Sequence, residues 1–169
     1  MEAHHLFSEF KRILENVAIR EIERKEKDEY DRVWNNLLFE DLSLWGISKE
    51  LEVVIRPALS DISDSTHTVP PVDFMWNRRE NGFLSKIELG VQCEWSANPE
   101  MILAAFEKLL VLECHHKILV CQQKRVTDME ALLSRIEVMI DVFESPQSVQ
   151  NYLIAVWIND HFEWKEVML

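Results

Sequence analysis

The chain contains little glycine and little cysteine, and both shortages exclude whole classes of protein. Only three glycines occur among 169 residues, so no glycine-rich loop of the kind that cradles the phosphates of ATP, GTP or NAD is available. The three cysteines, Cys93, Cys114 and Cys121, have no Cys-x-x-Cys spacing, which argues against a disulfide framework and against a zinc knuckle. We expect all three to be buried and reduced.

Positive charge and long apolar runs are also scarce. The 18 basic side chains are outnumbered by 30 acidic ones, for a formal net charge of −12, which disfavours nucleic acid as a partner because a polyanion is repelled. The basic residues that would have to converge to contact phosphates are Arg78, Arg79, Lys124 and Arg125. No apolar run approaches the roughly 20 residues of a membrane span. The sequence predicts a soluble, cytoplasmic protein without membrane association.

One stretch, residues 85–95, alternates strictly between apolar and polar side chains, which predicts a β-strand. An apolar run at 72–76 precedes it, and the Asn-Gly pair at 81–82 predicts a hairpin turn between the two. Asp73 and Glu94 would then lie on neighbouring strands. The predicted apolar face consists of Ile87, Leu89, Val91 and Cys93, and the polar face of Glu88, Gly90, Gln92 and Glu94.

The rest of the chain predicts helices and strands on both sides of this hairpin. Apolar spacing predicts a helix from Leu6. From Tyr30 it predicts a second helix, or the end of one long helix, that ends at the turn-prone residues 41–43. Asn98 and Pro99 predict the start of a helix over 98–114, and the capping box at Thr127 predicts a helix over 127–143. The expected strands are 51–56, 118–121, 152–158 and 161–167, and the segments expected to be polar and solvated are 20–32 and 60–71.

This order of elements predicts one α/β domain over residues 1–169, with a central mixed β-sheet flanked by helices. Its parts are N-terminal helices in 1–40, a core in 51–121, and a helix plus terminal hairpin in 127–169. The chain has six tryptophans, which we expect in the core or on a dimer surface. Trp157 and Trp164 lie on the terminal hairpin, where an edge strand would otherwise be exposed, so a homodimer is predicted.

Four short segments carry a resemblance to a known family. They are Val-Asp-Phe at 72–74, Val-Gln-Cys-Glu-Trp at 91–95, Phe-Glu-Lys-Leu-Leu at 106–110 and Lys-Ile-Leu-Val at 117–120. In this order, and within residues 51–121, they resemble the PD-(D/E)XK nuclease superfamily, which has the restriction-endonuclease-like fold. The motif is short and degenerate, so the resemblance depends more on the order of the helices and strands than on the identities of the residues.

The resemblance implies a metal-dependent nuclease. In that superfamily an aspartate on one strand and an acid-x-lysine on the next hold Mg²⁺, which activates water to attack a phosphodiester in DNA or RNA. Asp73 matches the aspartate, Gln92 stands where the second acid is expected, and Glu94 stands where the lysine is expected. The resemblance thus implies Asp73 and Glu94 as ligands of Mg²⁺ or its substitute Mn²⁺. It implies Lys108, or else Lys86, as the source of the missing lysine.

Gln92 is the main departure from the family pattern. An amide oxygen lacks the charge that offsets dehydration of a divalent cation, so metal affinity should fall.

Two hypotheses follow: a magnesium-dependent nuclease with a degenerate site, or a catalytically inactive nuclease-fold protein that binds or regulates, as a homodimer. A third is an interaction module that uses residues 20–32. A fourth reading is that Glu88, Gln92 and Glu94 only form the solvated face of a strand. Glu88 is expected to be solvated or to support the site, because it lies too far along the strand for the same ion.

Overall fold

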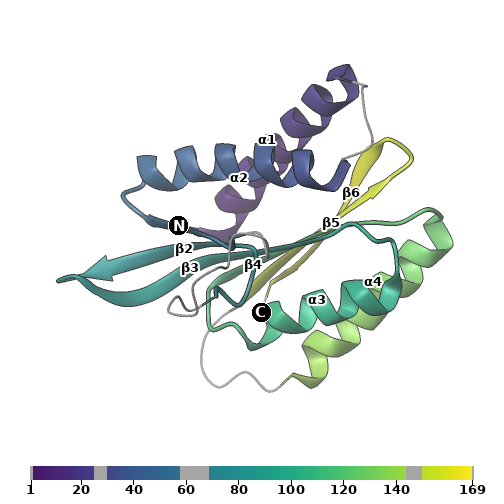
Figure 1. The fold of residues 1–169 in the computed structure, drawn as a ribbon. Helices are drawn as coiled ribbons and strands as arrows, with labels where there is room; N and C mark the ends of the chain where they lie inside the picture. The colour runs from purple at the N-terminus through teal and green to yellow at the C-terminus, as the bar shows by residue number, and fades with distance from the viewer. Residues whose placement is uncertain (1, 25–29, 58–68, 144–149, 169) are drawn as a thin grey trace.

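The computed structural model describes residues 2–24, 30–57, 69–143 and 150–168 (Figure 1). Within these ranges it contains four helices and six strands. The helices are α1 (Ala3–Arg24), α2 (Tyr30–Ser48), α3 (Pro99–Val111) and α4 (Val126–Val142). The strands are β1 (Glu52–Ile55), β2 (Phe74–Glu80), β3 (Phe83–Glu94), β4 (His116–Gln122), β5 (Asn151–Ile158) and β6 (His161–Met168).

The six strands form one open mixed sheet in the order β1-β2-β3-β4-β5-β6. The pairs β3–β4 and β4–β5 are parallel, and the other three pairs are antiparallel. Helices α1 and α2 cover one face of the sheet and α3 and α4 cover the other (Figure 1). The expected α/β architecture is therefore confirmed, including the hairpin, the crossover through α3 and the terminal hairpin.

Each face of the sheet has its own hydrophobic cluster, because successive side chains of a strand point to opposite faces. The cluster under α1 and α2 includes Phe74, Trp76, Leu89, Val91 and Cys93 from β2 and β3. The cluster under α3 and α4 includes Met75, Leu119 and Ile154. No helix among the described residues is long and apolar enough to cross a membrane.

Helix α1 is confirmed by the burial of its predicted apolar stripe, and α2 is longer than the sequence predicts. The residues of the α1 stripe are Leu6, Phe10, Ile13, Leu14 and Val17, all buried. The predicted end of the second helix at 41–43 is wrong, since α2 continues to Ser48.

The extra turns of α2 are held by contact with the sheet. Ser43 Oγ donates to the carbonyl oxygen of Phe39 at 2.5 Å, so its polar group is satisfied inside the helix. Trp76 Nε1 donates to the carbonyl oxygen of Leu42 at 3.1 Å. Gly46 lets the helix approach this indole, because a Cβ there would lie 2.3 Å from Trp76 Nε1. Tertiary packing thus overrides the local turn preference of this segment.

The N-terminus of α3 matches the prediction, but its end does not. Asn98 is the N-cap and its Oδ1 accepts a hydrogen bond from Glu100 N at 3.0 Å. The helix ends at Val111 rather than at residue 114, because Leu112 is extended.

Helix α4 begins earlier than its capping box predicts. The N-cap is Arg125, whose side chain makes no capping hydrogen bond, and Thr127 lies inside the helix. The Arg125 guanidinium instead donates twice, each at 2.7 Å, to the Asp128 carboxylate in the first turn. An acidic side chain is favourable there because the helix dipole is positive at that end.

The β2–β3 hairpin turns at Asn81 and Gly82, which both have positive φ, as a two-residue turn between right-twisted strands requires. The turn was predicted correctly, but strict alternation along β3 was not. A β-bulge lies opposite Trp76–Asn77, whose partners are Leu89 and Ile87, so that Glu88 is the extra residue. Because of the bulge, Ile87 packs against the α3–α4 cluster and not with the apolar face to which it was assigned.

The cysteines and tryptophans lie inside the fold. All three cysteines are buried and free of disulfides, as expected. Trp157 and Trp164 are partly buried against the α1–α2 cluster, and Trp157 contacts the ring of Trp34. The hairpin tryptophans therefore serve intramolecular packing. Residues 25–29 of the charged stretch and 58–68 of the polar loop lie outside the described residues.

A buried lysine closes the end of α3. The side chain of Lys117, at the start of β4, is only 1% exposed. Its ammonium group donates to the carbonyl oxygen of Leu110 at 2.9 Å and to Gln150 Oε1 at 2.8 Å, and lies 5.3 Å from the centroid of the Tyr152 ring. No carboxylate pairs with it in the part of the chain described. Burial lowers the pKa of Lys117 to about 8, an effect that nearby Cys114 partly opposes.

This lysine contributes stability that grows with pH in the alkaline range. The unfolded chain binds the Lys117 proton more tightly than the folded one, so the contribution of Lys117 to stability rises as the pH rises from about 8 toward 10.5. The three buried cysteines act in the opposite direction in both proteins, because burial raises their pKa and only the unfolded thiols ionise in this range. We therefore expect the free energy of unfolding, measured with urea between pH 8 and pH 9.5, to rise in the wild type relative to Lys117→Met. An equal slope in both proteins would contradict the assignment. Tyr152, whose pKa burial raises to about 12, does not titrate in this window.

Candidate functional site

The candidate site is centred on Asp73, at the bend that leads into β2. Its Oδ2 accepts hydrogen bonds from Gln92 Nε2 at 2.7 Å and from the backbone N–H of Cys93 at 2.9 Å. Its own carbonyl oxygen accepts from Arg56 N at 2.8 Å, beyond the end of β1. One residue thus joins three neighbouring segments of the sheet.

Gln92 lies on the α3 face of β3 and is 4% exposed. Its amide nitrogen is held by Asp73, and its Oε1 is buried without a hydrogen-bond partner. Gly90, two residues earlier on the same face, brings α3 close, since a Cβ there would lie 2.5 Å from Leu112 Cδ2. The structure therefore encloses the Gln92 amide between β3 and α3.

Two cations act on the Asp73 carboxylate. Burial raises the pKa of Asp73, and the Cys93 N–H, the charges of Arg56 and Lys108, and the Gln92 amide offset part of this rise. Lys108 lies on the exposed side of α3. The resemblance pointed to Lys108, but Arg56 was not singled out. The signal in the sequence that could have pointed to Arg56 was its position directly before Pro57, where the first strand ends.

Glu94 is partly exposed at the end of β3, and its Oε1 accepts from the backbone N–H of Ser96 at 2.9 Å. This bond holds the chain as it leaves the strand toward α3. Between Glu94 and either Asp73 or Gln92 the structure shows no hydrogen bond.

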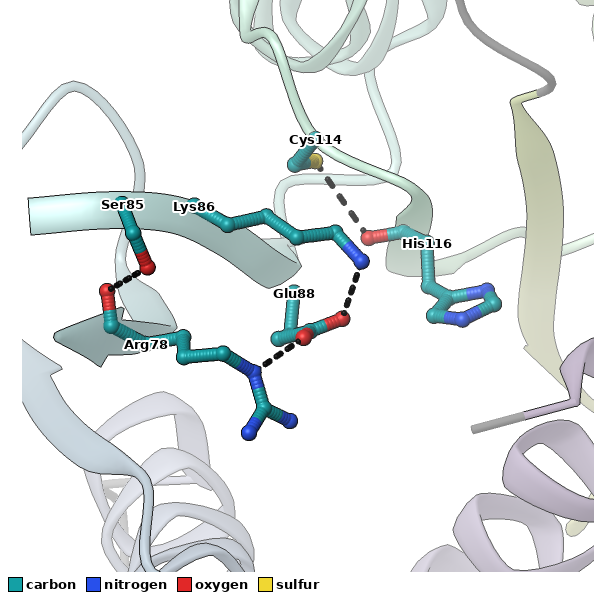
Figure 2. A network of polar contacts seen from close by, with 6 residues as sticks. All are labelled: Arg78, Ser85, Lys86, Glu88, Cys114 and His116. Atoms are coloured by element: carbon teal, nitrogen blue, oxygen red, sulfur yellow. Dashed lines mark hydrogen bonds and ion pairs between the residues drawn. The ribbon is translucent and has the colours of Figure 1, made fainter. Parts of the chain in front are cut away.

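Glu88 and Lys86 are placed away from this carboxylate. The bulge turns Glu88 toward the α1–α2 face, where it is buried with Arg78 Nε at 2.8 Å and Lys86 Nζ at 3.0 Å (Figure 2). Burial alone would raise the pKa of Glu88, but the two cations more than offset it and the pKa is lowered. The expectation that Glu88 is solvated or supports the site is wrong, and Lys86 is engaged with Glu88.

The idea that the polar residues of β3 form an ordinary solvated face is also wrong for two of its three members. Gln92 and Glu88 are buried, and only Glu94 is partly exposed. Burying polar side chains costs free energy unless their hydrogen bonds are made. The arrangement around Asp73 satisfies most of them and leaves Gln92 Oε1 unsatisfied.

These side chains fit a divalent cation poorly. Asp73 Oδ2 already accepts two N–H groups, and the amide nitrogen of Gln92 occupies the side of the carboxylate that faces β3. The oxygens left for a hard cation are Asp73 Oδ1, Gln92 Oε1 and Glu94 Oε2, of which one is uncharged. No group of three or more His, Cys, Asp or Glu side chains suited to a metal occurs among the residues described.

A scan of protein-family models, a search of curated proteins and a search of solved structures each returned no match to this chain.

Removing the Asp73 carboxylate should destabilise the fold. Asp73→Ala leaves the Cys93 N–H and the whole buried Gln92 amide without partners, at about 1–3 kcal/mol for each group. We expect the free energy of unfolding, measured with urea, to fall by about 2–4 kcal/mol. The control Glu94→Ala loses one bond at the surface and should cost about 1 kcal/mol or less. Equal losses in the two variants would show that the Asp73 contacts do not lock the strands.

Proposed function

We propose that this chain is a nuclease-like domain that has lost catalysis and acts by binding. The observation that carries the proposal is the hydrogen bond from Gln92 Nε2 to Asp73 Oδ2. In the nuclease superfamily that the sequence resembles, this position holds a second acid, and the two acids share a cation. Here a neutral donor satisfies the aspartate directly, so the site is stable without a cation.

The register of that hydrogen bond and one electrostatic interaction support a decayed nuclease-like site over a chance arrangement. Asp73 and Gln92 contact each other across the hairpin, in the register that matches the aspartate and the second acid of the motif. Lys108, the helix lysine that the resemblance pointed to, acts on the same carboxylate. A strand face that had never been a site would have no need to bring these three together.

The second candidate is the magnesium-dependent nuclease itself, acting on DNA or RNA. It is favoured by one observation, the buried Gln92 Oε1 without a partner. A carbonyl oxygen can ligate Mg²⁺ or Mn²⁺, and in that case Asp73 and Glu94 would supply the charged oxygens. Lys108 would then stabilise negative charge on the phosphate. The net charge of −12 weighs against nucleic acid as the substrate.

Gln92→Glu separates the two candidates. A restored carboxylate beside Asp73 supplies the charge that the site lacks. Calorimetry should therefore show no saturable Mn²⁺ binding for the wild type at millimolar metal, and binding for Gln92→Glu. The double variant Asp73→Ala/Gln92→Glu is the matched control and should lose that binding again.

The nuclease candidate is tested in parallel with plasmid DNA and single-stranded RNA in the presence of Mg²⁺ or Mn²⁺. Cleavage by the wild type that Asp73→Ala abolishes would overturn the binding proposal in favour of the enzyme. If Gln92→Glu folds but binds no metal, the nuclease-like origin of the site is contradicted.

The proposal includes a homodimer. The sequence pointed to the terminal hairpin as its interface, whereas the support in the structure lies at the β2–β3 hairpin. The β2–β3 hairpin extends beyond the helices (Figure 1). Phe83 and Leu84, next to its turn, are 77% and 52% exposed. Exposed apolar side chains at a strand end are typical of association surfaces. A cytoplasmic location also stays a proposal, supported by the three free cysteines.

Sedimentation velocity tests the dimer. We expect the wild type to sediment as a dimer at about 100 µM, and Phe83→Ser/Leu84→Ser to shift the equilibrium to monomer by at least about tenfold, since each buried apolar side chain contributes about 1.5 kcal/mol or more. The control Val142→Ser removes an equally exposed apolar side chain at the end of α4. A monomeric wild type, or equal effects of both changes, would contradict an interface at the hairpin.

A further inference from the structure

A cavity lies on the opposite face of the sheet from the Asp73 carboxylate. It has a volume of about 280 Å³ and lies between the start of α1, the chain after α2 and the strands β2 to β4. Its walls are Leu6, Lys49, Leu51, Trp76, Arg78, Glu88 and His116. This volume is near the lower end of the range for small-molecule sites, so only a small ligand fits.

The charged groups of this cavity are not fully used by the protein. Arg78 donates through Nε to Glu88, and Figure 2 shows its two terminal nitrogens pointing away from that carboxylate. No hydrogen bond holds them within the described residues. Lys49 is exposed and makes no ion pair with any described residue. Two cationic groups are therefore available to a ligand at the mouth of the cavity.

The single acid in the wall is already neutralised. Glu88 is paired with both Arg78 and Lys86, and Lys86 itself lines the neighbouring cavity beside β3. The formal charges of Lys49, Arg78, Lys86 and Glu88 together leave an excess of two positive charges. Glu80 acts on Arg78 and Glu9 acts on Lys49, but neither makes an ion pair there, and Glu9 is paired with Arg12. In a chain with a net charge of −12 this local excess is unusual. It favours an anion, which would be held by an arginine fork and an ammonium group.

Apart from the buried imidazole of His116, the remaining wall is apolar. Leu6, Leu51 and Trp76 belong to the hydrophobic cluster under α1 and α2, so their faces toward the cavity offer no hydrogen bonds apart from the Trp76 N–H, which is used by Leu42. An inorganic ion would make no hydrophobic contact with this apolar surface. A ligand with a small apolar body and one compact anionic group matches both halves.

We propose that this cavity binds a small amphipathic anion, with a phosphate or carboxylate on Arg78 and Lys49 and an apolar group against Leu51 and Trp76. The site is independent of Asp73 and does not rest on the proposed function. The bulge at Glu88 creates it, because it turns an acid into the α1–α2 face and thereby fixes the Arg78 guanidinium. Glu88 is a positioning residue here, since it acts through Arg78.

Two other cavities lined by described residues lack this combination. The groove of about 610 Å³ between α3 and α4 has Glu100 and Arg135 paired with each other across it. The cavity of about 390 Å³ beside β3 contains Lys86, whose ammonium group is engaged with Glu88.

Calorimetry of the full chain with four probes tests the proposal. The probes are phenyl phosphate, benzoate, inorganic phosphate and benzyl alcohol, each titrated at low salt. We expect phenyl phosphate or benzoate to bind at least about tenfold more tightly than both inorganic phosphate and benzyl alcohol, because only they use both halves of the cavity. Which of the two binds more tightly identifies the anionic group. Equal affinities for all four, or no heat with any, would overturn the proposal.

Lys49→Gln locates the binding. Lys49 is exposed and makes no ion pair with a described residue, so this variant should fold. We expect it to weaken the binding of phenyl phosphate or benzoate by about five- to tenfold. The control is Arg79→Gln, which removes a positive charge from the next residue of β2, where Arg79 is paired with Glu52 and lines no part of this cavity. An equal loss in both variants would show only a general charge effect and would contradict the site.

Discussion

The arrangement of the candidate site depends on one buried carboxylate, that of Asp73. The carboxylate accepts hydrogen bonds from the Gln92 side chain and the Cys93 backbone N–H, both on β3. The backbone carbonyl oxygen of Asp73 accepts a hydrogen bond from Arg56 N, beyond the end of β1. A desolvated carboxylate is costly unless donors and positive charges compensate for the lost water. The Gln92 amide, the Cys93 N–H, Arg56 and Lys108 meet that requirement. The same groups leave little of the carboxylate for a cation.

The sequence predicted the order of the elements well, because hydrophobic period and turn residues are local signals. Asn98 with Pro99 and the Asn81-Gly82 turn are such signals, and the structure has them where they were expected. It predicted the ends of elements less well. The continuation of α2 to Ser48 depends on the contact between Leu42 and Trp76, which are 34 residues apart in sequence, and no local pattern reveals it.

The candidate site was predicted in part. Asp73 and Gln92 contact each other, because the hairpin places them side by side. The charge of Lys108, which is exposed on the crossover helix, acts on Asp73, but the roles that the resemblance implies for these residues stay predictions. The bulge at Glu88 was not foreseen, since an extra residue in a strand leaves no mark in an alternating pattern. It moved Glu88 to the other face and built a second charged group with Arg78 and Lys86 (Figure 2). The two faces of β3 therefore carry different chemistry: a buried carboxylate that accepts hydrogen bonds on one, and a cavity with an excess of positive charge on the other.

The most direct test of the account follows the side-chain amide resonances of Gln92 by NMR during a titration with Mn²⁺, assigned by comparison with Gln92→Glu. If the Asp73–Gln92 hydrogen bond has replaced a metal site, these resonances stay sharp at Mn²⁺ concentrations that broaden the backbone amide resonances of residues with exposed carboxylates, such as Glu130. Selective broadening of the Gln92 amide by substoichiometric Mn²⁺ would place a metal beside Asp73 and contradict the central claim.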